Sequence, residues 1–188
     1  MKRIETELPG VCIIEPEVYN DARGYFFESY HREKFAGLGI DAVFVQENQS
    51  STRQGVLRGL HYQLKHPQAK LCRVNFGEVF DVAVDIRVGS KTCGRWVGVT
   101  LSDANRRQIF IPRGFAHGFI VRSESAEFIY KCDDFYHPED ECGVLWSDPQ
   151  LAIAWGNPKP QLASRDGSYP QLSQISPDRL PRYRGSDD

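Results

Sequence analysis

The chain has 188 residues, of which 40% are hydrophobic and 12% aromatic, and its formal net charge is -2 at pH 7. This length and composition predict a single domain over residues 1–188 with a hydrophobic core, and they exclude a wholly disordered chain. The charge balance argues against a nucleic-acid partner that depends on a broad basic surface.

Short extended segments, separated by Gly and Pro, dominate the chain. We predict strands over residues 10–18, 24–30, 43–51 and 55–63, and one short helix over residues 31–38 that ends at Gly39. Residues 69–87 predict two strands around Gly77, and the alternation in the second predicts a half-buried strand with one polar face. Further strands are predicted over residues 96–101, 108–112, 117–121 and 126–132.

Many short strands at a spacing of roughly 8–12 residues predict an all-β fold, either a sandwich, a jelly roll or a barrel. From about residue 157 the chain becomes rich in Pro and polar residues, and we expect residues 157–188 to form a tail packed on the barrel. The N-terminal segment MKRIETELPGVCII lacks an apolar run long enough for a signal peptide or a membrane span. A cytoplasmic location with no membrane partner is therefore expected.

The cysteines are widely spaced and include no CxxC pair, which argues against both a disulfide framework and a zinc site. We expect reduced thiols in the core at all five positions, which are Cys12, Cys72, Cys93, Cys132 and Cys142.

A histidine in the strand-like segment GVLRGLHYQ, residues 55–63, raises the question of a metal. Metal-binding β-barrels of this kind usually present an HxH pair, a nearby Glu and a distant third His. Here Tyr62 and Gln63 follow His61, no Glu lies between residues 64 and 75, and His66 adjoins Pro67. Two histidines, His61 and a distant His117, make a poor site without a carboxylate, so no metal is expected.

Proton transfer is the alternative use of such a cavity. A histidine with a pKa near neutrality can remove a proton, and a tyrosine with a high pKa can return one. Lys70 and Tyr130 lie on separate predicted strands and could converge with His61, where a lysine would stabilise an enolate oxygen. Taken alone, an edge lysine in solvent and a core tyrosine are the commoner roles for these residue types.

Three arginines, Arg23, Arg58 and Arg165, are candidates for binding an anion, because guanidinium binds phosphate through two hydrogen bonds. Phe26 and Tyr136 could stack on a flat ligand. Scattered arginines are usually surface residues and single aromatics usually core residues, and the sequence does not show that these five converge.

Five motifs together resemble the dTDP-4-dehydrorhamnose 3,5-epimerase family, and they occur in the family's order from about Gly10 to Gly167. The motifs are GVLRGLHYQ (55–63), GEVFDVAVDIR (77–87), IPRGFAHGF (111–119), YKCDDFY (130–136) and LASRDG (162–167). The resemblance implies a metal-free cupin jelly roll that needs no cofactor, acts on a dTDP-sugar as a homodimer, and serves the route to dTDP-L-rhamnose.

The resemblance also implies a role for each matching position. His61 would be the general base, held by Asp166, while Tyr130 would be the acid on the opposite face of the sugar. Lys70 would hold the enolate oxygen, and His117 would line the same pocket. Substrate contacts, partly made across the dimer, are implied for Arg23, Phe26, Glu28, Gln46, Asn48, Arg58, Glu141 and Arg165, and stacking on thymine for Tyr136.

Two departures from the family pattern leave ligand preference open. The family often has Lys before the dyad aspartate, where this chain has Arg165, and the segment LKHPQAKL replaces a loop usually containing Pro and Gly. Three alternatives to a double epimerase also stay open. They are an enzyme that inverts only C3 or only C5, a non-catalytic cupin that binds a nucleotide sugar, and a metal-dependent cupin.

One geometric prediction concerns Arg58 and His61. They are three positions apart, so in a regular strand their side chains would point to opposite faces, yet both are expected to meet one substrate. Gly59 is therefore predicted to form a bulge or local twist that brings both into the cavity.

Overall fold

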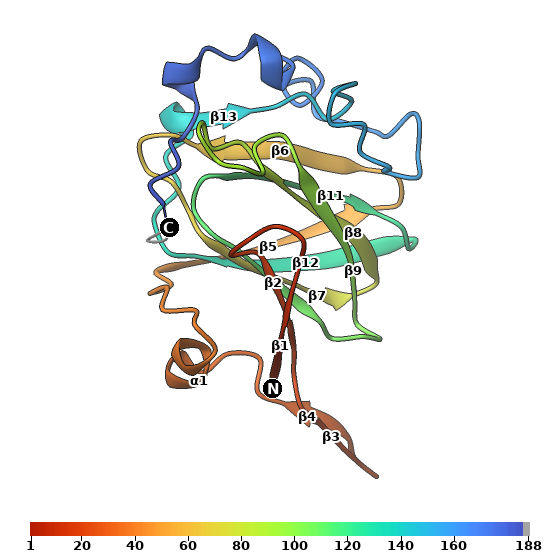
Figure 1. Ribbon diagram of the computed structural model, residues 1–188. Helices are drawn as coiled ribbons and strands as arrows, with labels where there is room; N and C mark the ends of the chain where they lie inside the picture. The colour runs from red at the N-terminus through yellow and green to blue at the C-terminus, as the bar shows by residue number, and fades with distance from the viewer. Residues whose placement is uncertain (186–188) are drawn as a thin grey trace.

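Two antiparallel sheets face each other in the computed structural model, which describes residues 1–185 (Figure 1). The six-stranded sheet has the order β1(Lys2–Glu5), β2(Cys12–Glu15), β10(Gln108–Ile111), β7(Lys70–Phe76), β12(Ser125–Cys132) and β5(Gln46–Arg53). The five-stranded sheet has the order β13(Glu141–Gly143), β6(Leu57–Gln63), β11(Phe115–Val121), β8(Glu78–Asp85) and β9(Trp96–Ser102). The prediction of an all-β sandwich or jelly roll is confirmed.

The main core lies between the two sheets. Leu101 of β9, Ile109 of β10 and Phe128 of β12 are fully buried there, and the Phe119 and Phe128 rings stack at 4.1 Å between centroids. Burying an apolar side chain of this size stabilises the fold by about 1.5–3 kcal/mol. This core holds the two sheets together, and a pocket remains open between them.

Strand β8 corrects one prediction, because both of its faces are buried rather than one. Val82 and Val84 pack outward against a second cluster with Trp155 and Leu180 from the C-terminal part of the chain. The opposite face turns inward, and Asp81 lies there with none of its surface exposed. Alternation identified the two faces correctly, but the polar face is directed into the sandwich instead of into water.

The C-terminal segment covers the outer face of the five-stranded sheet, as expected for a packed tail (Figure 1). Tyr62 of β6 donates a hydrogen bond to the carbonyl of Arg179 at 2.9 Å. The Arg87 guanidinium lies between two rings, 4.4 Å from the centroid of Phe115 and 5.0 Å from that of Tyr183. The tail contains two short 3-10 helices, η2(Leu172–Gln174) and η3(Pro177–Arg179).

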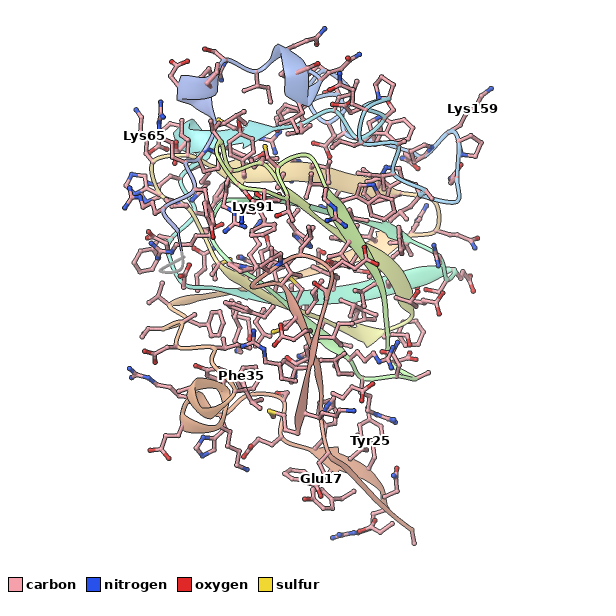
Figure 2. The ribbon with its side chains drawn as sticks, in the orientation of Figure 1. Glu17, Tyr25, Phe35, Lys65, Lys91 and Lys159 are labelled. Carbon is pink, nitrogen blue, oxygen red and sulfur yellow. The ribbon has the colours of Figure 1, made fainter. Side chains whose placement is uncertain are left out.

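The N-terminal region carries the elements outside the sandwich. The predicted helix is confirmed as α1(Arg32–Gly37), which buries Phe35 and is followed by Gly39 at φ +77°, where glycine is favoured. The predicted strand 10–18 is split, because Pro16 has no N–H for the ladder. A separate hairpin, β3(Val18–Asp21) and β4(Gly24–Phe27), projects from the body with Tyr25 on it (Figure 2).

The prediction of five core thiols is wrong in part. Cys12, Cys72 and Cys132 are buried, whereas Cys93 is exposed and Cys142 is half-buried. Cys93 lies in a turn between β8 and β9, where its side chain is exposed. Among residues 1–185, no helix has the length and apolar character needed to cross a membrane.

Candidate active site

Strand β6 carries a bulge at Gly59, as predicted. His61 pairs with His117 of β11, but Arg58 pairs with Phe119, so three steps along β6 correspond to two along β11. Gly59 has φ +131°, and a Cβ there would lie 2.6 Å from Cα of Gly118. Only glycine fits this crossing, and the extra residue turns the side chains of Arg58 and His61 toward the same pocket.

The pocket has a volume of about 700 Å³ and opens between the two sheets. This is within the usual range of about 300–1,000 Å³ for small-molecule sites. It brings together most of the predicted site residues, namely Gln46, Asn48, Arg58, His61, Lys70, His117, Tyr130, Tyr136, Glu141, Arg165 and Asp166.

His61 and Asp166 form a hydrogen-bonded pair in the pocket wall. Nε2 of His61 lies 2.8 Å from Oδ1 of Asp166, with the imidazole 26% exposed and the carboxylate side chain only 4% exposed. The second carboxylate oxygen accepts a hydrogen bond from the backbone N–H of Gly59 at 3.3 Å. A buried carboxylate thus holds an accessible imidazole, which is the arrangement of an oriented general base.

The pKa of the Asp166 carboxyl lies below its ordinary value. Burial on its own would raise this pKa, but the hydrogen bonds from His61 and Gly59 and the charges of His61 and Arg165 lower it further than burial raises it. The ionised carboxylate is therefore the form present in the folded protein at neutral pH.

This pKa shift predicts a pH-dependent contribution to stability. A carboxyl whose folded-state pKa is depressed stabilises the fold above its unfolded pKa of about 3.9, and this stabilisation is lost as pH falls through the folded-state pKa. We expect Asp166→Asn to be less stable than the wild type near about pH 6, with a difference that shrinks below about pH 4. Urea unfolding across this range measures the difference, and a difference that grows on acidification would contradict the assignment.

Tyr130 and Lys70 enter the pocket from the six-stranded sheet, on β12 and β7. Burial, reinforced by neighbouring acidic groups, raises the pKa of Tyr130 to about 12, so its phenol is protonated at neutral pH. Nζ of Lys70 lies 5.8 Å from the centroid of the Tyr130 ring. The side chains of Tyr130 and Lys70 therefore lie next to each other, on the sheet opposite the one that carries His61.

His117 faces the pocket from β11 and has a partner that the sequence reasoning did not assign. Its Nε2 lies 2.9 Å from Oδ2 of the fully buried Asp81, and its ring stacks near Phe128. Asp81 occurs in the motif GEVFDVAVDIR, on the polar parity of its strand. The alternation of the strand therefore placed Asp81 on the polar face, but the strand was predicted to be half-buried, which leaves a polar face to solvent and not to a cavity.

Glu141 organises the rim of the pocket. Its carboxylate accepts hydrogen bonds from the hydroxyls of Tyr136 at 2.6 Å and Tyr169 at 3.2 Å, and it forms an ion pair with Arg165 at 2.5 Å. The Tyr169 ring also meets the edge of the His61 ring, with centroids 5.8 Å apart. Tyr169 was not predicted, and no motif in the sequence pointed to it.

Three predicted residues are not brought to the pocket. Arg23 and Phe26 lie on the β3–β4 hairpin, where the Arg23 side chain is 90% exposed and bonds only to neighbouring Asp21 among the described residues. Glu28 follows the hairpin and pairs with Lys34 of α1. Within one chain none of the three lines the pocket that contains His61.

One group of potential metal ligands joins His117 of the pocket lining to Cys72 and Asp81, which are fully buried. Burial raises the pKa of the Cys72 thiol well above its ordinary value, and a cysteine ligates metals as the thiolate. His117 already has Asp81 as a hydrogen-bond partner. The donor set is therefore a poor fit to a catalytic cation.

The comparison with known proteins decides what kind of site this is. Residues 5–174 match the family model of dTDP-4-dehydrorhamnose 3,5-epimerase. The chain belongs to this family. It is accordingly an epimerase, an enzyme of the isomerase class, and the predicted resemblance and the cupin-like jelly roll are both confirmed.

Relatives cover nearly the whole chain. The dTDP-4-dehydrorhamnose 3,5-epimerase of Pseudomonas aeruginosa is 52% identical over 168 residues, which span 88% of this chain and 93% of that protein. A Legionella pneumophila dTDP-6-deoxy-D-glucose-3,5-epimerase, solved with dTDP-4-keto-L-rhamnose, superposes with a TM-score of 0.95 at 51% identity, covering 97% and 98% of the two chains. The Streptomyces bikiniensis 3'-monoepimerase, solved with dTDP-quinovose, gives 0.89 at 32% identity, covering 95% and 92%.

Proposed function

We propose that this epimerase inverts both C3 and C5 of dTDP-4-dehydro-6-deoxy-D-glucose and yields dTDP-4-dehydro-L-rhamnose. The observation that carries the proposal is the placement of base and acid on facing sheets of one pocket. His61 stands on β6 of the five-stranded sheet, and Tyr130 stands on β12 of the six-stranded sheet. A sugar ring between the sheets has one group on each of its faces.

Removal of a proton is the role of His61. The 4-keto group acidifies the hydrogens at C3 and C5, so deprotonation of either carbon gives an enolate. Because Nε2 of His61 is bonded to Asp166, the other ring nitrogen, Nδ1, remains to accept the proton. The ionised Asp166 stabilises the imidazolium that forms, which strengthens the base at the moment of transfer.

Stabilisation of the enolate is the role of Lys70, and return of a proton is the role of Tyr130. The ammonium group of Lys70 can hold the negative oxygen at C4 while the carbon is planar. The phenol of Tyr130 then donates its proton to the opposite face, which inverts the centre. His61 loses its proton to solvent and Tyr130 regains one, so both groups are reset for the second centre.

We expect Tyr130→Phe to separate proton removal from inversion. His61 is untouched in this variant, so C–H exchange with solvent continues, while the missing phenol slows delivery to the other face by about 10²-fold or more. Proton NMR in heavy water measures exchange, and the ratio of inverted to uninverted sugar measures delivery. Equal losses of exchange and inversion would contradict the role of acid for Tyr130.

The nucleotide part of the substrate is assigned to the polar and cationic side of the pocket. Arg58 and Arg165 can bind the diphosphate, whereas Gln46 and Asn48, which are hydrogen-bonded to each other at 3.0 Å, face the same space. Tyr136 is 44% exposed at the rim and presents its ring to a thymine.

The β3–β4 hairpin is assigned to the pocket of a second copy of the chain. It projects from the body (Figure 1) and exposes Tyr19, Tyr25 and Phe26, of which Phe26 is 70% exposed. Such an aromatic surface is unusual for a hairpin that meets only water. A homodimer in which the hairpin reaches the partner would bring Arg23, Phe26 and Glu28 to the substrate.

Mixed dimers provide the test of this exchange. We expect the double variant Arg23→Ala/Phe26→Ala and the variant His61→Asn each to be nearly inactive, and their mixture, after dissociation and reassembly, to recover activity. The recovery arises because one pocket of the mixed dimer combines an intact His61 with an intact hairpin from the other subunit. The mixture would stay inactive if the hairpin served its own subunit.

A single-centre epimerase is the second candidate, because a solved epimerase that acts at one centre shares this fold. The Streptomyces bikiniensis 3'-monoepimerase has the same fold with a TM-score of 0.89. Product analysis by NMR separates the two, since ring proton couplings differ between sugars inverted at one centre and at both. A product inverted at C3 alone would replace the double epimerase, and binding without turnover would leave a non-catalytic nucleotide-sugar protein.

A further inference from the structure

A second group of potential metal ligands lies outside the pocket and has no role in the proposed chemistry. It comprises His66 from the β6–β7 loop with Asp134 and His137 from the loop after β12, and one ligand atom from each lies within 4.8 Å of the others. The two imidazole rings are stacked, with centroids 3.9 Å apart and an angle of 18° between their planes. We call these three residues the loop triad.

A buried glutamine fixes the backbone on both sides of the loop triad. Nε2 of Gln63 donates to the carbonyls of His66 at 2.6 Å and Phe135 at 3.1 Å, and its Oε1 accepts from the N–H of His137 at 2.7 Å. Gln63 is only 6% exposed, so these bonds are shielded from competing water. The two loops are thereby held at a set separation.

Two further side chains complete this framework. Oδ2 of the buried Asp140 accepts hydrogen bonds from the N–H groups of Lys65 and His66, each at 2.8 Å. Gln68 donates to the carbonyl of Asp134 at 2.9 Å. Each member of the loop triad therefore has a backbone position fixed by a side chain from the opposite segment, namely Asp140 for His66, Gln68 for Asp134 and Gln63 of β6 for His137, which lowers the entropic cost of binding a ligand.

The donor chemistry of the loop triad is that of a transition-metal site. Two imidazoles and one carboxylate suit borderline cations such as Zn²⁺, Co²⁺ and Ni²⁺, and they are unsuited to Mg²⁺. Within residues 1–185, no hydrogen bond engages the His66 ring, so it can rotate out of the stack to direct a nitrogen at the ion. Nδ1 of His137 lies 3.3 Å from Oε1 of Glu139, so a carboxylate outside the loop triad orients this imidazole, as is usual for a metal-binding histidine.

We propose that the loop triad binds one divalent transition cation of the Zn²⁺ class. The ion joins the β6–β7 loop to the loop after β12 by a link that lies outside the hydrophobic core. Tyr136, at the rim of the pocket, stands between Asp134 and His137 in the chain, and Lys70 follows the β6–β7 loop. The site therefore adjoins the substrate pocket without sharing a ligand with it.

The test is a titration of tag-free protein, freed of metal by a chelator, with Zn²⁺ by calorimetry and with Co²⁺ by visible absorption. We expect one saturable site per chain. His66→Asn and His137→Asn should each weaken Zn²⁺ binding by at least about tenfold, because each removes a direct ligand. Lys65→Ala is the matched control, since Lys65 is an exposed neighbour at the edge of the molecule (Figure 2), and it should bind as the wild type does.

Three results would overturn the proposal. The first is the absence of saturable Zn²⁺ binding to the wild type. The second is unchanged affinity in both histidine variants, whose folding is checked by metal-free thermal unfolding. The third is a thiolate-to-Co²⁺ charge-transfer band that Cys72→Ser removes, since it would place the ion at the buried group of Cys72, Asp81 and His117.

Discussion

His61→Asn is expected to lower kcat by about 10²–10⁴-fold, because asparagine keeps the approximate size and polarity of the side chain but cannot accept a proton at neutral pH. Loss of the base should stop proton removal from both C3 and C5, since one group is assigned to both centres. Turnover of the dTDP-4-keto sugar and exchange of its C–H protons with solvent are the two measurements.

Binding separates this outcome from a damaged pocket. Calorimetry with dTDP should give nearly the same Kd for His61→Asn as for the wild type, because the nucleotide is assigned to Arg58, Tyr136 and Arg165. His66→Asn is the matched control, as it makes the same change five residues along the chain, outside the pocket, and should retain turnover. Substantial exchange at either carbon in His61→Asn would remove His61 from the role of base.

Lys70→Ala is expected to keep the fold and lower kcat by about 10²–10³-fold, the usual effect of losing one group that stabilises an oxyanion. Lys70 is half-buried at the start of β7, and its ammonium group lies beside Tyr130, on the sheet opposite the one that carries His61. Because the enolate exists only along the reaction path, the loss should fall on kcat more than on KM.

The exposed Lys65 again provides a matched control, since Lys65→Ala removes the same charge nearby and should leave kcat unchanged. Lys70→Arg tests geometry, because a guanidinium keeps the charge but not the compact donor, and we expect only partial recovery. Near-normal turnover of Lys70→Ala would contradict the assignment of Lys70 to the enolate oxygen.

Local signals in the sequence were sufficient for most of the strands, because period-2 alternation and Gly or Pro boundaries are properties of short segments, but β1, β13 and most of β3 were not predicted. These signals were insufficient for β8, where both faces are buried. A strand face that lines a polar cavity carries the same residue types as a face in solvent, so the sequence pattern does not distinguish the two. Local signals also missed the break at Pro16, since the strand predicted over residues 10–18 ends at Glu15 and a different strand, β3, begins at Val18. Which sheet a strand joins depends on pairing between distant residues, which no segment of the chain encodes alone.

The site divides in the same way. The bulge at Gly59 followed from a conflict between strand parity and a shared substrate, and the structure confirms it through the register of β6 against β11. The resemblance supplied the remaining pocket residues. Asp81 and Tyr169 were missed because their roles arise from contacts with His117 and Glu141, which are far from them in the chain.

The measurement that tests the central claim most directly is deuterium uptake from heavy water into dTDP-4-keto-6-deoxyglucose, followed by proton NMR. The account predicts that the wild type incorporates deuterium at both C3 and C5 and that His61→Asn incorporates it at neither. Uptake at only one carbon, or uptake at both that survives in His61→Asn, would contradict a double epimerase in which His61 serves as the base at both centres.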